Sequence, residues 1–212
     1  MIKDKRKEKQ DLIIEKAREV FLEKGFFNTV MDDIAQRVGL TRRSLYRYFQ
    51  TKEELAYETT IELLDEWNSY QNDIFLKLEG EGIRRLKSFL DDLIDYMEKR
   101  IDVMMYLGEF DFYFKDDGLI KPSSKSIVKF DEIILKSDHL LSEIIKLGKK
   151  DGSIREDLDV DLTVATISNV LWSFGQRIAI RSKSIKKESG FSGIDLIYNQ
   201  VDIYILAIEE VK

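Results

Sequence analysis

Arginine and tyrosine side chains that could bind DNA alternate along one short stretch of the chain, from Thr41 to Lys52. A guanidinium can donate two parallel hydrogen bonds to guanine O6 and N7, which discriminates between bases by about 1–3 kcal/mol. Tyrosine hydroxyls and a lysine ammonium can donate to phosphate oxygens. Each residue taken alone fits an ordinary solvated surface better, so only their common pattern indicates DNA recognition.

Two short helices joined by a tight turn are needed to present these side chains. Apolar spacing predicts a first helix at about Met31 to Val38, which ends at Gly39, and a second at about Arg42 to Phe49. Such a pair is a helix-turn-helix, whose second helix enters the major groove of DNA. The residues expected to pack inward are Ile34, Ala35, Val38, Leu45 and Phe49. The outward face of the second helix carries Arg42, Arg43, Tyr46 and Arg47.

Longer helices are expected on both sides of this pair. One runs from about Lys9 to Lys24, before Gly25. The other opens at Thr51, where a capping box would let the hydroxyl accept from the N–H of Glu54 while the Glu54 carboxylate reaches back to Thr51. Lys52 lies in the first turn of that helix and opposes its dipole, which is understandable if a phosphate approaches there.

The rest of the chain also shows helical spacing, while strand-like alternation is scarce and Pro122 is the only proline. We predict an all-α fold of about nine helices, with a three-helix helix-turn-helix DNA-binding domain at residues 1–52 and a larger helical ligand-binding and dimerisation domain at residues 53–212. The stretch from Ser182 to Gly193 is rich in Lys, Ser and Gly and is expected to be a loop.

Charge is distributed unevenly along the sequence. Residues 1–52 contain 13 basic and 8 acidic residues, a balance of +5, whereas residues 53–212 carry −11. This asymmetry favours a polyanionic partner for the first segment and not for the second.

Composition excludes several classes of site. The chain has no cysteine and a single histidine, His139, so thiolate metal sites, cysteine nucleophiles and paired-imidazole sites are excluded. It contains no serine elbow, phosphate-binding loop or dinucleotide motif, and we expect no enzyme activity, no metal and no cofactor. The charged N-terminus and the lack of an apolar run of about 18–20 residues predict a cytoplasmic protein without a secretory signal or a membrane span.

The stretch from Gly25 to Leu55, GFFNTVMDDIAQRVGLTRRSLYRYFQTKEEL, resembles the DNA-binding domain of the TetR (tetracycline repressor) family of bacterial regulators. The matching elements are Ile34-Ala35, Gly39-Leu40-Thr41, Leu45-Tyr46, Tyr48-Phe49 and Lys52-Glu53-Glu54-Leu55. The resemblance implies a homodimer that binds palindromic operator DNA. It also implies a helical C-terminal domain that dimerises and holds a pocket for a small molecule.

By this resemblance, DNA contacts fall on Thr41, Arg42, Arg43, Ser44, Tyr46, Arg47, Tyr48 and Lys52. Two positions depart from the family pattern. Where the family usually has a Ser or Thr that caps the helix and touches a phosphate, this chain has Val30 preceded by Thr29, so both roles either shift to Thr29 or are lost. At Arg43 the family often has a small residue, and the long side chain here should reach bases instead.

Soft and aromatic residues in the second domain suit a drug-sized organic molecule, although such stripes more often form a core. With the resemblance, they predict an unidentified small hydrophobic or amphipathic effector. The candidate contacts are Trp67, Tyr96, Met97, Met105, Tyr106, Phe110, Phe114, His139 and Trp172.

Two late helices are candidates for dimerisation. The segment from Val160 to Ile180 is apolar around most of its circumference, so it must be buried on more than one side. With the last helix, from Ile194 to Val211, it could complete a four-helix bundle across a two-fold axis. The candidate interface residues are Val164, Ile167, Leu171, Phe174, Gly175, Ile178, Ile197, Val201, Tyr204 and Ile208.

These patterns predict a sequence-specific DNA-binding transcriptional regulator, a repressor released from a palindromic operator by a small-molecule ligand. The alternative is a helical small-molecule-binding or scaffold protein whose first domain binds a protein partner. Retention on duplex DNA at low salt discriminates between the two. Turnover of a bound compound would be needed to support an enzyme.

Overall fold

The computed structural model describes residues 2–114 and 124–210 of the chain, and these residues are almost entirely helical. The helices are α1 (Ile2–Lys24), α2 (Met31–Val38), α3 (Arg42–Leu45), α4 (Lys52–Phe75), α5 (Gly82–Lys99), α6 (Ile101–Tyr113), α7 (Ser124–Ser137), α8 (His139–Asp151), α9 (Val160–Ser189) and α10 (Gly193–Ile208). The predicted all-α fold is confirmed, since β-pairing within the described ranges is limited to one isolated bridge between Ile154 and Glu209. Among these helices, none combines the length and apolar character that crossing a membrane requires.

The helices group into two compact units. Unit 1 comprises Met1–Asp65 and Met105–Ile133, and unit 2 comprises Glu66–Met104 and Ile134–Lys212. Unit 1 therefore contains the first part of α4 and most of α6 in addition to α1, α2 and α3. The predicted domain boundary after residue 52 stays a prediction.

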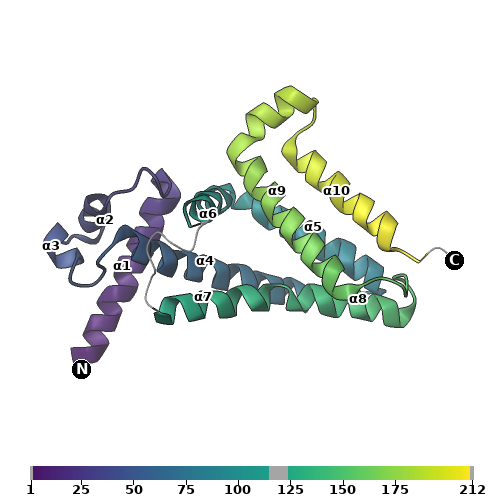
Figure 1. The fold of residues 1–212 in the computed structure, drawn as a ribbon, viewed down its shortest axis with the longest axis horizontal. Coiled ribbons are helices and arrows are strands. Elements are labelled where there is room, and N and C mark those ends of the chain that lie inside the picture. Colours follow the sequence, from purple (N-terminus) through teal and green to yellow (C-terminus); the bar gives the residue numbers. More distant parts are fainter. Residues whose placement is uncertain (1, 115–123, 211–212) are drawn as a thin grey trace. The chain divides into compact units, whose positions relative to one another are not determined.

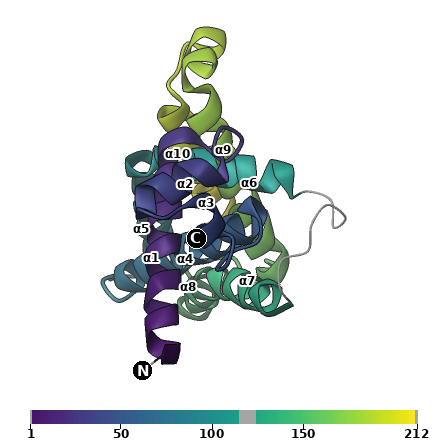
Figure 2. The ribbon, with the colours of Figure 1, turned by 90° about the vertical axis from the view of Figure 1, so that its left-hand side faces the viewer.

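Unit 1 is organised around α1, whose apolar residues recur on one face. Ile13, Ala17, Val20 and Phe21 are at most 1% exposed, as their spacing predicts for a buried stripe. Helix α2 packs against α1, and α3 packs against α2 (Figure 2). The exposed ion pair between Lys24 and Asp33 also joins α1 to the first turn of α2, but such pairs contribute at most about 1 kcal/mol each. Apolar burial is therefore what mainly holds the three helices together.

The core of unit 2 lies among α5, α8, α9 and α10. Helix α10 lies beside both α5 and α9 (Figure 1, where α9 is light green and α10 is yellow). Helix α5 starts where the Asp151 carboxylate accepts from the N–H of Gly82 at 2.7 Å and the Ser153 hydroxyl accepts from the N–H of Ile83 at 3.0 Å. A Cβ at Gly82 would overlap the backbone of Gly148, so only glycine lets α5 and α8 approach this closely.

The predicted loop from Ser182 to Gly193 is wrong for most of its length. Helix α9 continues to Ser189 and ends at Gly190, which adopts the left-handed conformation at φ 81°. The helix is interrupted locally at Arg181, whose angles are φ −123° and ψ 19°. Beyond that point Ile185 is buried, so the surrounding Lys and Ser residues form the solvated face of an amphipathic helix and not a loop.

Candidate nucleic-acid interface

The turn between α2 and α3 depends on Gly39 and Thr41. Gly39 ends α2 at φ 72° and ψ 34°, a left-handed conformation that glycine adopts without steric cost. The N–H of Leu40 then donates to the carbonyl of Ala35 at 2.8 Å. The Thr41 hydroxyl accepts from the N–H of Ser44 at 3.2 Å and caps α3. The connection is thus a tight turn of three residues, Gly39 to Thr41, which fixes the direction of α3.

Helix α3 is a single turn, and hydrogen-bonded turns continue it to Phe49. The N–H groups of Tyr48 and Phe49 both donate to the carbonyl of Leu45, at 2.9 and 3.1 Å. Leu45 is 0% and Phe49 is 4% exposed, so these two side chains anchor the segment in unit 1. The residues predicted to face outward are exposed, namely Arg42, Arg43, Tyr46 and Arg47. Thr41 is also exposed, while Ser44 and Tyr48 are half-buried.

Arg42 is held on this surface by two neighbours. Its Nη2 donates to the Tyr46 hydroxyl at 3.4 Å, and its guanidinium carbon lies 5.6 Å from the centre of the Tyr46 ring. Its Nη1 lies 3.5 Å from the Asp32 carboxylate on α2. The hydrogen bond to Tyr46 and the nearby negative charge of Asp32 raise the pKa of Arg42. By contrast, the guanidinium groups of Arg43 and Arg47 make no hydrogen bond or ion pair with any residue that the structure describes.

Thr29 does not take over the capping role that the sequence suggested for it. Its side chain is 0% exposed, and its hydroxyl donates to the carbonyl of Gly25 at 2.7 Å. Val30 occupies the N-cap position of α2, where the Asp33 carboxylate accepts from the Val30 N–H at 3.0 Å. Thr29 is therefore a buried structural residue in this conformation, and a phosphate contact through its hydroxyl would require the loop to open.

Helix α4 starts close to the predicted position. Thr51 Oγ1 accepts from the N–H of Glu54 at 3.1 Å, whereas the Glu54 carboxylate accepts from Gln50 at 2.8 Å, one residue earlier than predicted. The ammonium of Lys52 donates to the carbonyl of Phe26 at 2.8 Å and lies 4.2 Å from the centre of the Phe26 ring. Burial lowers the pKa of Lys52. An ammonium has three donors, so the bond to Phe26 leaves others available to an anion.

The exposed side of α3 carries mainly hydrogen-bond donors and positive charge. Guanidinium groups only donate hydrogen bonds and keep their charge at any physiological pH. A surface made of three exposed arginines with hydroxyl groups between them suits a ligand that is rich in acceptors and negative charge. The major groove edge and the phosphates of duplex DNA have both properties, and an exposed helical turn fits into that groove.

Comparison with known proteins assigns the chain to a family. Residues 13–59 match the family model described as bacterial regulatory proteins, tetR family. The biofilm operon icaADBC HTH-type negative transcriptional regulator IcaR of Staphylococcus aureus (strain Newman) is 32% identical over 132 residues, which cover 57% of this chain and 68% of IcaR. The chain belongs to the tetR family. It is accordingly a DNA-binding transcriptional regulator.

Solved structures agree with the fold of this tetR-family chain. The ketosteroid transcriptional regulator KstR2 of Mycobacterium tuberculosis aligns with a TM-score of 0.65 at 19% identity, covering 95% of each chain. The regulator FadR of Bacillus subtilis, solved in complex with stearoyl-CoA, aligns with a TM-score of 0.64 at 18% identity, covering 92% of this chain and 96% of FadR. At these identities the similarity establishes the fold alone.

The predicted effector contacts of this tetR-family chain lie in both units. In unit 2, the ring of Trp67 lies 5.2 Å from Tyr96 and 5.6 Å from Trp172. Met97 is buried beside them in the same apolar core. His139 is exposed at the first residue of α8, away from any such packing in the described part of unit 2.

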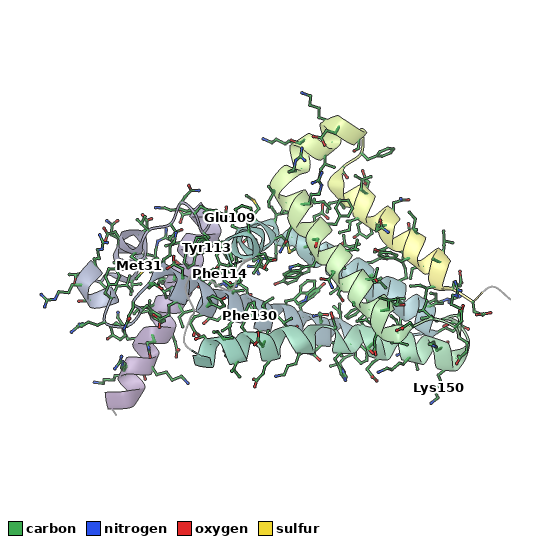
Figure 3. All side chains as sticks on the ribbon, viewed as in Figure 1. Met31, Glu109, Tyr113, Phe114, Phe130 and Lys150 are labelled. Carbon is green, nitrogen blue, oxygen red and sulfur yellow. The ribbon has the colours of Figure 1, made fainter. Side chains whose placement is uncertain are left out.

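The remaining candidates lie on α6 in unit 1. Tyr106 is buried and its ring lies 6.4 Å from Phe110, which in turn lies 4.5 Å from Phe114. Phe110 and Phe114 also contact Phe130 of α7 and Tyr57 of α4, a cluster labelled in part in Figure 3. Met105 is 42% exposed. Whether any of these residues touches an effector stays a prediction.

The residues predicted for the dimer interface mostly lie in the chain's own core. Val164, Ile167, Leu171, Ile178, Ile197, Val201 and Ile208 are at most 6% exposed within the single chain. Gly175 is buried too, and a Cβ there would come within 2.8 Å of Met97 Sδ, so its small size accommodates the chain's own α5. Phe174 and Tyr204 are half-buried and pack against the same core. The rest of unit 2 already buries most of this apolar face, and a contribution of these residues to a dimer contact stays a prediction.

Two carboxylates at this site were not singled out from the sequence. Asp32 had only a general signal, because an acidic residue in the first turn of a helix is common for the helix dipole alone. Glu109 had no local signal, since it lies 83 residues from the N–H of Phe26 that it binds.

Proposed function

We propose that this chain is a homodimeric transcriptional repressor that binds a palindromic operator through α3 and is released by a small amphipathic molecule. The observation that carries this proposal is the exposed set of Arg42, Arg43, Tyr46 and Arg47 on a helical turn inside the segment that matches the tetR family. Two copies would place these turns in successive major grooves, about 34–36 Å apart. Further DNA contacts are proposed at Thr41, Ser44, Tyr48 and Lys52.

Exposed apolar residues on α9 and α10 support dimerisation through these helices. Leu162 and Val170 of α9 are 66% and 39% exposed, and Ile203 and Leu206 of α10 are 50% and 73% exposed. The two helices lie side by side in unit 2, so these side chains belong to neighbouring surfaces. A second copy of the chain would cover them in an isologous contact, in which each surface meets its own counterpart.

An amphipathic effector is supported by composition and by one relative. The Trp67, Tyr96 and Trp172 rings gather in unit 2 with a polar end in the Tyr96 hydroxyl. FadR of Bacillus subtilis was solved with stearoyl-CoA, a molecule with a long apolar tail and a charged head. We extend that ligand class to this chain as a proposal. The effector would act only through a higher affinity for the conformation that does not bind DNA.

Selection from a random DNA pool tests the DNA part of the proposal. The expected result is an enriched sequence with two inverted half-sites whose centres lie about 10 base pairs, or a related spacing, apart. Binding should weaken steeply with salt because phosphate contacts release counterions. Failure to enrich any sequence, with the purified chain folded, would contradict the proposal and favour a protein partner for the exposed face of α3.

Addition of lauroyl-CoA or stearoyl-CoA to the complex with the selected duplex tests the effector class. We expect one of the two to release the duplex and to raise the melting temperature of the free protein, since a ligand that binds only the folded state stabilises it. Free coenzyme A is the matched control for the charged head. Equal effects of coenzyme A and the acyl compounds would contradict an effector recognised by its apolar tail.

A further inference from the structure

Helix α6 contacts the region around α1 and α4 through one face. Tyr106, Glu109 and Tyr113 are spaced i, i+3 and i+7 and therefore lie on the same side of the helix. The Tyr106 hydroxyl donates to the carbonyl of Ala56 at 3.0 Å, and the Tyr113 hydroxyl donates to the carboxylate of Glu53 at 2.9 Å. These two contacts attach α6 to α4 within unit 1, on either side of Glu109 along the helix.

Glu109 does something different from its two neighbours, because it binds the loop between α1 and α2. Its Oε2 accepts from the N–H of Phe26 at 2.5 Å and from the N–H of Phe27 at 3.3 Å. Gly25 leaves the space for this carboxylate, since a Cβ there would lie 2.7 Å from Glu109 Oε1. Figure 3 labels Glu109 on α6 together with Met31, the first residue of α2 that follows this loop.

Lys52 binds the other backbone polar group of Phe26. The Phe26 N–H donates to the carboxylate of Glu109, and the Phe26 carbonyl accepts from the ammonium of Lys52 at 2.8 Å. The Phe26 side chain is 0% exposed and packs against Tyr113 with ring centres 4.6 Å apart. The carboxylate of Glu109 on α6 and the ammonium of Lys52 on α4 thus both bind the backbone of one loop residue. Hydrogen bonds to charged groups are among the stronger ones.

We propose that Glu109 is a positioning residue for DNA binding. From α6 it fixes the position of the α1–α2 loop, and the loop in turn fixes the positions of α2 and α3. This inference rests on the proposed function, because it concerns the DNA-binding state of the surface on α3. The loop leads directly into α2, and α2 packs against α3, which carries Arg42 and Arg43. Loss of the Glu109 contact would let the start of α2 shift and would spread the arginines over many orientations, which raises the ordering cost of binding.

The direction in which DNA affinity changes when Glu109 is neutralised distinguishes the positioning role from the loss of a negative charge alone. Removal of a carboxylate close to a DNA-binding surface should by itself strengthen binding to a polyanion, because it removes a like charge. The positioning role predicts the reverse, a loss of affinity when Glu109 becomes neutral. Glu132 supplies the matched control, since it is an exposed carboxylate on α7 in the same unit.

The test compares the full chain with its Glu109→Gln, Glu109→Ala and Glu132→Gln variants. Amide hydrogen exchange at Phe26 and Phe27 should be at least about tenfold faster in Glu109→Ala, with a smaller change in Glu109→Gln, which keeps a neutral acceptor. The dissociation constant for the selected duplex, measured well below the melting temperature, should rise about tenfold in Glu109→Ala, equivalent to about 1.4 kcal/mol. Glu132→Gln should bind as tightly as the wild type or slightly more tightly.

Two results would overturn the inference. One is unchanged exchange at both amides in Glu109→Ala. The other is a lower melting temperature with an unchanged dissociation constant for the folded protein, which would give Glu109 a structural role alone. A wild type that binds no duplex would overturn the proposed function. The exchange rates at Phe26 and Phe27 would then still show whether Glu109 holds the loop.

Discussion

The guanidinium of Arg42 stacks beside the ring of Tyr46 at 5.6 Å and donates to its hydroxyl at 3.4 Å. The two residues are four apart, so the exposed side of α3 orders its own first arginine before any ligand arrives. An arginine that is already held loses less side-chain entropy on binding. Asp32 also lies 3.5 Å from this guanidinium and would have to release it before Arg42 reached a base.

Neutralising Asp32 should therefore strengthen DNA binding. In Asp32→Asn, Arg42 loses its carboxylate partner and the surface loses one negative charge, so we expect the dissociation constant for the selected duplex to fall by about two- to fivefold. Fluorescence anisotropy with a labelled duplex measures this directly. A weaker complex would mean that Asp32 orients Arg42 toward DNA and does not restrain it. Glu132→Gln reports the effect of charge alone.

Stability should decrease at alkaline pH because of Tyr106. Burial raises the pKa of Tyr106 above its ordinary value of 10.0, so the folded state keeps a proton that the unfolded state loses. Its stabilising contribution is complete below that ordinary value and is lost as pH rises above it. In Tyr106→Phe, the buried hydroxyl that bonds to Ala56 and Thr60 is absent, which should cost about 1–3 kcal/mol near neutral pH.

Urea unfolding of the wild type and Tyr106→Phe at several pH values checks this prediction. The difference in unfolding free energy should shrink above pH 10 by up to about 1.4 kcal/mol per pH unit, since phenylalanine has no proton to lose. A difference that stays constant across this range would show that Tyr106 titrates equally in the folded and unfolded states, and a difference that grows would show that folding lowers its pKa.

Leu206 should be part of the contact between two copies of the chain. It is 73% exposed on α10, and Leu206→Glu should convert the dimer into monomers without unfolding unit 2, because a charge would enter a desolvated contact. Sedimentation velocity measures the change in mass. Leu76→Glu is the matched control, since Leu76 is 82% exposed just after α4. Dimers that persist in Leu206→Glu would place the interface on another surface.

The parts of the fold that local rules control were predictable from the sequence. Gly25 and Gly39 mark the ends of α1 and α2, and the Thr51 hydroxyl caps α4, because caps and left-handed glycines depend only on nearby backbone. The outward direction of Arg42 and Tyr46 follows from helical periodicity once Leu45 is placed inward.

The parts that depend on distant neighbours were not predictable. The ammonium of Lys52 donates to the carbonyl of Phe26, 26 residues earlier in the chain, a contact that no local pattern indicates, while its contact with a phosphate stays a prediction. Periodicity marks Val201 and Ile167 as buried without identifying what buries them, and within the single chain they lie in the core of unit 2. Nothing in the sequence indicated that Glu109 binds the α1–α2 loop, because the two lie 83 residues apart and meet only in the folded chain.

If the arginines of α3 contact base edges, Arg43→Ala should lose affinity for one specific sequence. The guanidinium of Arg43 makes no hydrogen bond or ion pair among the described residues, so its removal disturbs the free protein little. The decisive measurement is the ratio of dissociation constants for the selected duplex and a random duplex of equal length. We predict that this ratio changes by about 5- to 150-fold, which corresponds to about 1–3 kcal/mol, through a loss of affinity for the selected duplex. Equal weakening on both duplexes, or no change on either, would contradict base recognition by Arg43.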